Sequence, residues 1–363
     1  MFKRISEYAT AEREHRAKLL NNRMRFGVDF LDDALRGILT EDLVLLGAIP
    51  GSGKTELCCN IALANLEDGK KVHFISLESS EYEITSRMKY PLVSQRYHAD
   101  PNRPKLESPL NFPDWLQGKY LTELKEYEDS ANEYFKAAYQ NLHLFEKGNK
   151  FGIDELIQSI LYCAEDTDLI IVDHIHYFDM DENENENRAL KKIMKTAREL
   201  CLEQGRPIVL VGHLRKPDRS NDDMVPDMNE FHGSSDLSKI ATKVITMAPG
   251  KYTSAGTYET FFRTPKCRID GGVSRFIGRE FYNPKKGAYE KNRYEIGWAQ
   301  QKRGEDFEVI EPLFTPTWAR GPVPYQQGSA TSNTPNSVKN LAPNAGGTEM
   351  FPGLRKGDKR NPF

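Results

Sequence analysis

The chain has 363 residues, with 50 lysines and arginines against 53 aspartates and glutamates, a formal net charge of −3, and 38% hydrophobic residues. This length allows one large or two ordinary domains with a packed core, and the near-neutral charge argues against a protein that binds nucleic acid through bulk positive charge. The five cysteines form no CxxC pair, which excludes a zinc finger and predicts reduced thiols in a cytoplasmic protein. No apolar run reaches the roughly 20 residues of a membrane helix, which excludes a membrane protein. The N-terminus lacks the apolar region of a secretion signal, which excludes a secreted protein.

The first 24 residues are charged with scattered apolar positions, which predicts a linker helix that packs on its own core or on a neighbouring subunit. From Phe26 onward, short apolar runs alternate with helical stretches. Continuous Val/Ile/Leu runs separated by helices are typical of a parallel sheet covered on both faces. We therefore predict an α/β fold with a mainly parallel central sheet flanked by helices. The expected strands are 43–48, 72–78, 168–173, 207–213 and 243–247, with a helical segment between Tyr90 and Leu144.

The C-terminal part differs in composition. From about Pro322 it is rich in Pro, Gly, Ser, Asn and Thr, with almost no aliphatic clusters, so burial cannot offset the entropy of ordering it. We predict three regions: the linker helix 1–24, a folded core over 25–312 and a disordered tail over 313–363. The tail either recruits partner proteins or is a solubilising extension.

A glycine-rich segment, GAIPGSGKT at 47–55, follows the first apolar run and precedes a helical pattern. In this strand–loop–helix context it predicts a phosphate-binding loop, because glycines let backbone N–H groups turn toward phosphate oxygens at a helix N-terminus. Lys54 would neutralise the β- and γ-phosphate oxygens, and the Thr55 hydroxyl would bind Mg²⁺. Ala48 stands where the strict pattern has glycine. The expected nucleotide contacts are Ala48, Pro50, Gly51, Ser52, Gly53, Lys54 and Thr55.

Polar residues end the neighbouring apolar runs. Asp173 ends DLIIVD, where a carboxylate can bind the Mg²⁺ hydration shell, and Glu78 ends FISLE, where it can orient or deprotonate an attacking water. His213 ends the next run and can contact the γ-phosphate. Each residue also has a structural alternative: a helix cap for Asp173, a solvated strand end for Glu78 and a buried, backbone-bonded ring for His213. Together with the glycine-rich loop they predict ATP hydrolysis.

Two histidines follow Asp173 as an HxH pair, His174 and His176. This spacing can hold a transition metal, but the sequence offers no suitably spaced third ligand. We therefore do not predict a metal site there.

The order of motifs GAIPGSGKT, SLE, LIIVDHIHYF, VLVGHLRKP, HGSSDLSKIATKVITM and KCR resembles the RecA-like motor domain of DnaB-type hexameric replicative helicases over residues 25–300. The phage primase-helicase branch is similar in its Asp-His-Ile and its His-Leu-basic-x-Pro, which suggests a phage protein acting in the host cytoplasm. The resemblance implies a RecA-like P-loop ATPase core. Because 24 residues precede the motor segment, we expect no primase or collar domain.

The resemblance implies further roles. Lys266 and Arg268 match the basic pair that such helicases insert into the neighbouring subunit's ATP site, where an arginine clamps the transferred phosphoryl group. Phe281 or Tyr282 would stack on the adenine, with a core-packing role equally open for either ring.

The resemblance also implies a loop that follows single-stranded DNA through a central pore. Basic side chains and backbone N–H groups would contact its phosphates. The acidic segment 179–187, and His232 in place of the family's arginine, depart from the DNA-binding pattern. The expected DNA-binding residues are Arg215, Lys216, Arg219, Gly233 and Ser234.

We accordingly expect an ATP-dependent (or other NTP- or dNTP-dependent), Mg²⁺-requiring, ring-forming DNA translocase and replicative helicase, acting as a hexamer on single-stranded DNA. Its tail would contact other replication proteins. The alternatives are a RecA-like recombination filament and a KaiC-like ATPase that signals through a protein partner; the acidic segment and the net charge of −3 favour the signalling ATPase.

Overall fold

The computed structural model describes residues 4–145, 151–177, 179, 185–214, 222–231, 235–269 and 274–310. Within these ranges the helices are α1 (Ile5–Asn21), α2 (Asp29–Leu35), α3 (Lys54–Glu67), α4 (Glu81–Ala99), α5 (Phe112–Leu116), α6 (Lys125–Ala138), α7 (Ile153–Glu165), α8 (Glu186–Gln204), α9 (Ser235–Ile240) and a 3-10 helix, η1 (Met228–Glu230). The strands are β1 (Leu43–Ala48), β2 (Val72–Ser76), β3 (Leu142–Phe145), β4 (Leu169–Asp173), β5 (Ile208–His213), β6 (Lys243–Tyr252), β7 (Tyr258–Cys267), β8 (Phe276–Asn283) and β9 (Ala288–Trp298).

Some sequence predictions fall outside these residues. The five expected DNA-binding residues (Arg215, Lys216, Arg219, Gly233 and Ser234), most of the acidic segment 179–187 and the tail 313–363 are not described.

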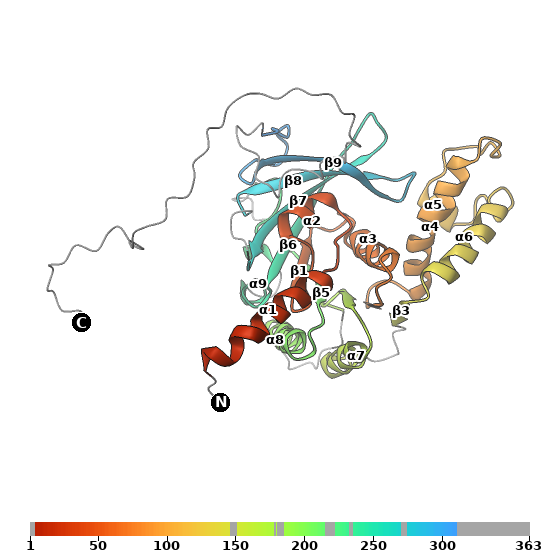
Figure 1. Cartoon of the computed structure of the whole chain (residues 1–363). Helices are drawn as coiled ribbons and strands as arrows, with labels where there is room; N and C mark the ends of the chain where they lie inside the picture. Colours follow the sequence, from red (N-terminus) through yellow and green to blue (C-terminus); the bar gives the residue numbers. More distant parts are fainter. Residues whose placement is uncertain are drawn as a thin grey trace, which may run out of the picture. The chain divides into compact units, whose positions relative to one another are not determined.

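In the described residues the strands form one sheet, in the order β3-β2-β4-β5-β1-β6-β7-β8-β9 (Figure 1). The pairs from β3 to β6 are parallel, and those from β6 to β9 are antiparallel. Ala48, the last residue of β1, lies opposite His213 of β5, and Ser76 of β2 lies opposite Asp173 of β4. Because parallel strands end at the same edge, the residues that follow these strands gather there.

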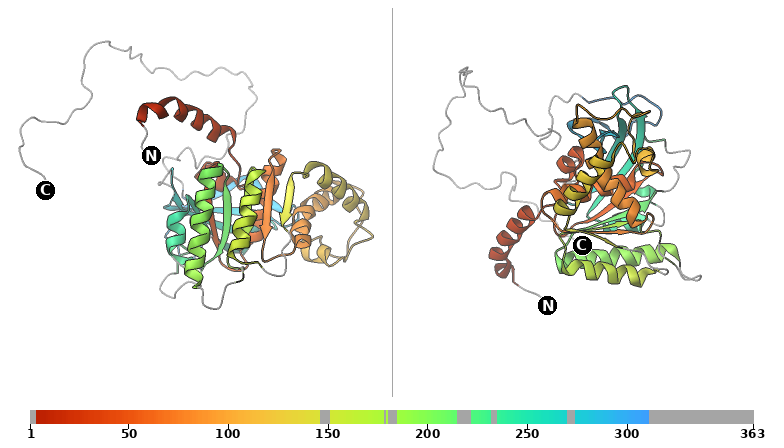
Figure 2. Two further views of the ribbon diagram at one scale, coloured as in Figure 1. Left: turned by 90° about the horizontal axis from the view of Figure 1, so that it is seen from below. Right: turned by 90° about the vertical axis from the view of Figure 1, so that its right-hand side faces the viewer.

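Helices cover both faces of the parallel strands. Val44 and Leu46 of β1 pack in one core with α2, α3 and the start of α4, whereas Leu43 and Leu45 pack in the other with α7, α8 and α9. Figure 2 (left) shows α9, α8 and α7 side by side on this second face. Burial on both faces explains why these strands are continuously apolar in the sequence.

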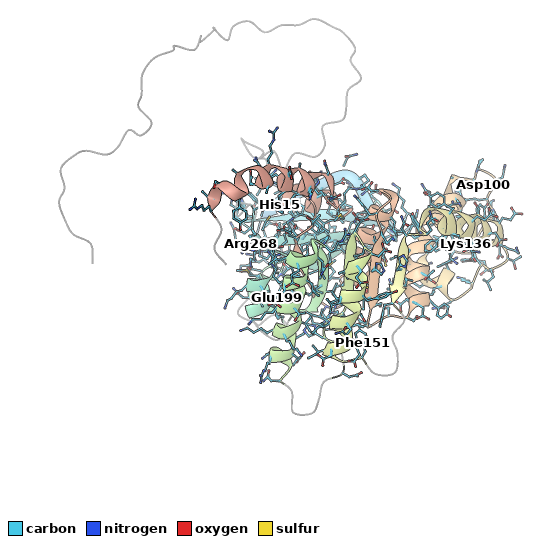
Figure 3. The ribbon with its side chains drawn as sticks, turned by 60° about the horizontal axis from the view of Figure 1, so that its bottom comes forward. His15, Asp100, Lys136, Phe151, Glu199 and Arg268 are labelled. Atoms are coloured by element: carbon cyan, nitrogen blue, oxygen red, sulfur yellow. The ribbon has the colours of Figure 1, made fainter. Side chains whose placement is uncertain are left out.

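Helices α4, α5 and α6 form a helical arm beside the sheet, on the right in Figures 1 and 3. At its base, the Ser94 hydroxyl donates a hydrogen bond to the Lys285 carbonyl in the β8–β9 turn. Gly287 in the same turn lies against Pro91, since a Cβ there would come within 2.7 Å of the proline ring. The arm is thus attached to the sheet at this turn. Its own core contains Tyr90, Val93, Tyr97, Leu110, Trp115, Tyr120, Leu124 and Ala131.

The α/β fold with its mainly parallel sheet is as the sequence predicted. Strands β1, β4 and β5 lie within a residue of the predicted bounds, β6 extends five residues further, and β2 ends at Ser76, two residues before Glu78. The strands that the prediction missed are β3 and β7 to β9. Strands β7 to β9 carry charged side chains such as Arg279 and Glu280 among their apolar ones, so they lack the continuous apolar run that identifies a fully buried strand.

Helix α1 forms where a helix was expected, and it projects from the folded core (Figure 2). Its described side chains are largely exposed, including Ile5 and Tyr8, although His15 Nε2 lies 3.4 Å from Glu41. The sequence left open whether this helix packs on its own core or on a neighbouring subunit, and in this single chain most of its described side chains are exposed.

The structure also describes the cysteines and the hydrophobicity of the helices, on which the sequence analysis drew. The five cysteines are free and buried. Among the described helices, none is long and apolar enough to cross a bilayer.

Glu280 of β8 is a buried carboxyl group beneath α2. Its Oε1 accepts a hydrogen bond of 2.7 Å from the Phe30 backbone N–H, while Oε2 is buried without a hydrogen-bond partner. Burial raises the pKa of Glu280 well above its ordinary value, and the nearby Asp29 and Asp33 charges raise it further. The folded state therefore holds a proton on Glu280 that the unfolded chain releases near pH 4.5.

Replacing Glu280 by Gln should stabilise the protein in a pH-dependent way. A group whose pKa is raised on folding stabilises the native state below its unfolded pKa, and this stability is lost as the pH rises. Wild type and Glu280→Gln should therefore melt at similar temperatures near pH 4.5, and the variant should melt about 2–4 °C higher, or more, at pH 8. Glu295→Gln, at a partly exposed position paired with Arg279, is the control. The same difference in melting temperature at both pH values would contradict the assignment of a protonated Glu280.

Candidate functional site: a phosphate-binding loop at the carboxyl edge of the sheet

The loop between β1 and α3 has the backbone of a phosphate cradle. Gly51 and Gly53 adopt left-handed φ angles of 81° and 84°, which side-chain-bearing residues rarely adopt. Gly53 is the N-cap of α3 and makes no side-chain cap, so the first N–H groups of the helix face the loop without a side-chain acceptor from that residue. A helix N-terminus of this kind favours an anion.

Lys54, the first residue of α3, is buried with 8% of its surface exposed. Its Nζ lies 3.0 Å from His174 Nε2 and 3.0 Å from His213 Nδ1. Burial lowers the pKa of Lys54, and the charges of Glu78 and Asp173 act in the opposite direction. The lysine is thus held between two imidazole nitrogens, which phosphate oxygens can replace.

Thr55 and Asp173 meet where Mg²⁺ would bind. The Thr55 hydroxyl donates a 2.7 Å hydrogen bond to Asp173 Oδ2, and Asp173 Oδ1 is fully buried without a hydrogen-bond partner. Burial raises the pKa of Asp173 to about 6, while the Thr55 hydroxyl lowers it. The Ser52 hydroxyl in the loop is also buried and without a partner. The Thr55 hydroxyl and a carboxylate with one unpaired oxygen fit Mg²⁺, which usually binds one or two protein oxygens together with phosphates and waters.

Glu78 lies two residues beyond β2, exposed at the same edge. Tyr177 donates a 3.4 Å hydrogen bond to Glu78 Oε1, and the negative charge of Glu78 raises the pKa of Tyr177. The same charge acts on Lys54 and Asp173, so the three groups are close. The sequence predictions for Lys54, Thr55, Asp173, His213 and Glu78 therefore converge on one edge.

A cavity of about 320 Å³ opens beside the loop, and Tyr282 of β8 lines it. The Tyr282 hydroxyl donates a 2.7 Å hydrogen bond to Glu56, one residue after Thr55, and Glu56 also pairs with Arg87 of α4 at 3.5 Å. Phe281 instead is buried under Arg279 and Arg293, whose guanidinium carbons lie 5.6 and 4.1 Å from its ring centre. Of the two candidate stacking rings, Tyr282 faces the cavity and Phe281 packs in the core.

Lys266 and Arg268 lie at the other edge of the sheet. The Arg268 backbone N–H donates to the Thr242 carbonyl, and Thr242 in turn bonds to Leu43, the first residue of β1. The loop begins after the last residue of β1, roughly 16 Å further along the strand. Lys266 Nζ donates to the Ser238 and Lys239 carbonyls in the last turn of α9, whereas Arg268 is exposed (labelled in Figure 3). Neither residue can reach the loop of its own chain.

The sequence matches the model of the family described as "DnaB-like helicase C terminal domain" over residues 24–260. The chain belongs to this family. The match begins just before the core and ends within β7, so it includes the phosphate-binding loop, Glu78, Asp173 and His213.

The relatives and the solved structure that this chain resembles are also named as replicative helicases. The chain is 22% identical over 226 residues to a probable replicative DNA helicase of Trieres chinensis and 23% identical over 225 residues to the replicative DNA helicase DnaB of Helicobacter pylori, each match covering 61% of this chain. These matches cover 46% and 42% of the two relatives, so the chain spans less than half of their length. A DnaB-like replicative helicase, solved in a study of its interactions with primase, superposes with a TM-score of 0.60 at 15% identity, covering 80% of this chain and 67% of that chain. The α/β core is therefore the RecA-like fold of DnaB-like ATPase domains.

Four site residues of this DnaB-like domain were not among the sequence predictions. His174 contacts Lys54, Tyr177 contacts Glu78, and Glu56 joins Arg87 to Tyr282. The HxH pattern drew attention to His174 as a metal ligand only. Glu56 and Arg87 gave no signal, because a charged pair on two helices 31 residues apart has no local pattern.

Thr55→Val should separate folding from Mg²⁺ binding. Valine keeps the shape of threonine but removes the hydroxyl that bonds to Asp173 and would bind the metal. We expect an unchanged circular dichroism spectrum and a loss of about 10–100-fold in the Mg²⁺-dependent part of ATP affinity, measured by titration with and without EDTA. Thr55→Ser retains the hydroxyl and should bind Mg²⁺–ATP like the wild type. Equal affinities for the Val and Ser variants would rule out Thr55 as a ligand.

Proposed function

We propose that this protein is an ATP-dependent, ring-forming translocase on single-stranded DNA and a replicative DNA helicase, which hydrolyses the nucleotide at the interfaces between its subunits. The observation that carries the proposal is the separation of Arg268 from its own phosphate-binding loop, by most of the length of β1. An arginine that acts on the transferred phosphoryl group must then come from a second copy of the chain.

The hydrolysis step uses groups at the carboxyl edge of the sheet. Lys54 and the loop N–H groups would bind the β- and γ-phosphates, and Thr55 and Asp173 would hold Mg²⁺, which supplies charge neutralisation on the phosphate oxygens. Glu78 is exposed at this edge, where it can accept a proton from the attacking water. Tyr177 restrains Glu78 through its hydrogen bond.

Nucleotide recognition and sensing would use two further residues. The Tyr282 ring lines the cavity beside the loop and would stack on the base, with its hydroxyl held by Glu56. His213 ends β5 beside Lys54, where it would contact the γ-phosphate. Arg268 is the better candidate for the arginine finger than Lys266, whose amine already caps the carbonyls of α9.

Ring assembly has a second support in α1. This helix projects with exposed apolar residues, which a neighbouring subunit could bury. DNA would contact the segment after β5 through Arg215, Lys216 and Arg219, and Gly233 and Ser234 would offer backbone N–H groups. The tail would recruit replication proteins.

A mixing experiment tests the shared site. Lys54→Ala and Arg268→Ala should each lose ATP hydrolysis, because each destroys one half of every interface. In a 1:1 mixture, about one quarter of the interfaces would join an intact loop to an intact Arg268, so activity should partly return. A mixture of Lys54→Ala with the double variant has no intact interface and is the control. No recovery in the first mixture, with both variants folded and assembled, would show a site contained in one chain.

A salt titration tests DNA binding. Affinity for single-stranded DNA should fall with salt, with a log–log slope of about −0.7 for each phosphate contact. Replacing Arg215, Lys216 and Arg219 by Ala should make this slope shallower by about 2. The matched variant removes three basic residues of the helical arm (Lys105, Lys125 and Lys136) and should keep the wild-type slope. A protein that binds no DNA under any salt condition would instead support a signalling ATPase, and open filaments in electron micrographs would support a recombination protein.

A strand-displacement assay tests the helicase activity itself. Forked DNA with a 5′ or a 3′ tail should be unwound in the presence of Mg²⁺ and ATP, and Glu78→Gln should bind ATP but fail to unwind. Unwinding by Glu78→Gln at the wild-type rate would exclude Glu78 as the residue that activates water.

A further inference from the structure

We propose that His174 is a positioning residue that holds Lys54 in place for the hydrolysis step, and that His174 and His176 connect Lys54 to the end of β5. This inference rests on the proposed function, because it concerns how the same nucleotide site communicates with the segment proposed to bind DNA. It gives the HxH pair a role that neither the phosphate-binding loop nor metal binding requires.

The geometry starts at the buried lysine. An ammonium group donates three hydrogen bonds and accepts none, and an unpaired one is costly to bury. Two of the donors of Lys54 have acceptors at 3.0 Å, one on His174 and one on His213. His174 is fully buried, whereas His213 is partly exposed. His174 is therefore the acceptor that water cannot replace.

The protonation of the rings follows from these contacts. To accept from Lys54, His174 must be neutral with its proton on Nδ1. The Nδ1 proton points to His176 Nδ1, which lies 3.3 Å away. His176 Nδ1 must then be an acceptor.

The same His176 nitrogen meets β5. It lies 3.3 Å from the backbone nitrogen of His213, whose N–H donates to it, so its one lone pair is shared between the His174 and His213 donors. Lys54 is thus linked to His213 twice: directly to its ring, and through His174 and His176 to its backbone. The rings are packed together, with the centres of His174 and His213 3.8 Å apart.

The connection has a consequence for nucleotide binding. When phosphate oxygens bind Lys54, they compete with the two histidine nitrogens for its N–H groups. A change in the His174 contact alters the hydrogen bond that His176 accepts from the backbone N–H of His213, the last residue of β5. The chain continues from β5 into the segment that carries Arg215 and Lys216, so the link joins the phosphate site to the proposed DNA contacts.

A metal-binding role for the HxH pair has no support in the structure. In the parts of the chain that are described, no group of three histidine, cysteine, aspartate or glutamate side chains is arranged to hold a metal ion. Two of the four ring nitrogens of the pair, His174 Nε2 and His176 Nδ1, contact Lys54 and the His213 backbone instead.

The first test compares His174→Gln with His174→Leu. A glutamine places an amide oxygen where Nε2 of the histidine lies, so it can still accept from Lys54, whereas leucine cannot. We expect kcat for ATP hydrolysis to fall about tenfold in the Leu variant with KM changed less than threefold, and to recover to within threefold of wild type in the Gln variant. If both variants are equally impaired, or if the loss lies in KM, His174 does not position Lys54.

His174→Asn guards against a trivial folding effect. Asparagine is polar like glutamine but too short to place an acceptor at Nε2. It should therefore resemble the Leu variant in kcat while melting like the Gln variant. An Asn variant as active as the Gln variant would overturn the assignment, even if the Leu variant does not fold.

The second test addresses the link to β5 through His176, which contacts His174 and His213. Asparagine at this position keeps an acceptor at the Nδ1 level, and leucine removes it. His176→Leu should lose most of its stimulation by single-stranded DNA, measured as the ratio of stimulated to basal ATP hydrolysis, while His176→Asn keeps that ratio. Equal stimulation in both variants would overturn the link. If the wild type itself shows no stimulation, the proposed function fails rather than this inference.

Discussion

Three parallel strands end side by side, and their last residues share the edge of the sheet with a buried lysine. Because β1 pairs with β5, and β5 with β4, the loop after Ala48 lies next to His213 and near Asp173. Lys54 then needs acceptors in a place that water scarcely reaches, and the structure supplies imidazole nitrogens in place of carboxylates. A carboxylate paired to Lys54 would compete with phosphate for the same charge, whereas a neutral ring gives way more readily.

The antiparallel half of the sheet instead places residues far from the phosphate-binding loop. Strand β7 runs back along β6, so its last residues return to the edge where β1 begins. Arg268 is consequently exposed far from its own loop, while Lys266 is tied to α9. This arrangement leaves Arg268 accessible to another molecule. The projecting helix α1 likewise exposes apolar side chains that another molecule could contact. An exposed Arg268 and an exposed α1 are what the proposed site shared between subunits requires.

The helical arm lines part of the cavity beside the phosphate-binding loop. Its first helix, α4, begins three residues after Glu78 with Ser80 as its cap, and it supplies Arg87 to the Glu56 carboxylate that also holds Tyr282. The arm is fastened again at the β8–β9 turn through Ser94 and Pro91. A base bound against Tyr282 would therefore touch a network that includes the phosphate-binding helix, the antiparallel sheet and the arm.

The sequence by itself determined the parallel core and the phosphate-binding loop, because continuous apolar runs and the glycine spacing of GAIPGSGKT are local patterns with one physical meaning. It also indicated that Asp173, His213 and Glu78 would meet, since residues that end parallel strands share an edge. Only the tertiary structure decided that Tyr282 and not Phe281 faces the cavity, that Lys266 is engaged while Arg268 is exposed, and that His174 holds Lys54. These outcomes depend on which side chains from distant elements are buried together, and pairings of that kind leave no periodic trace along the chain.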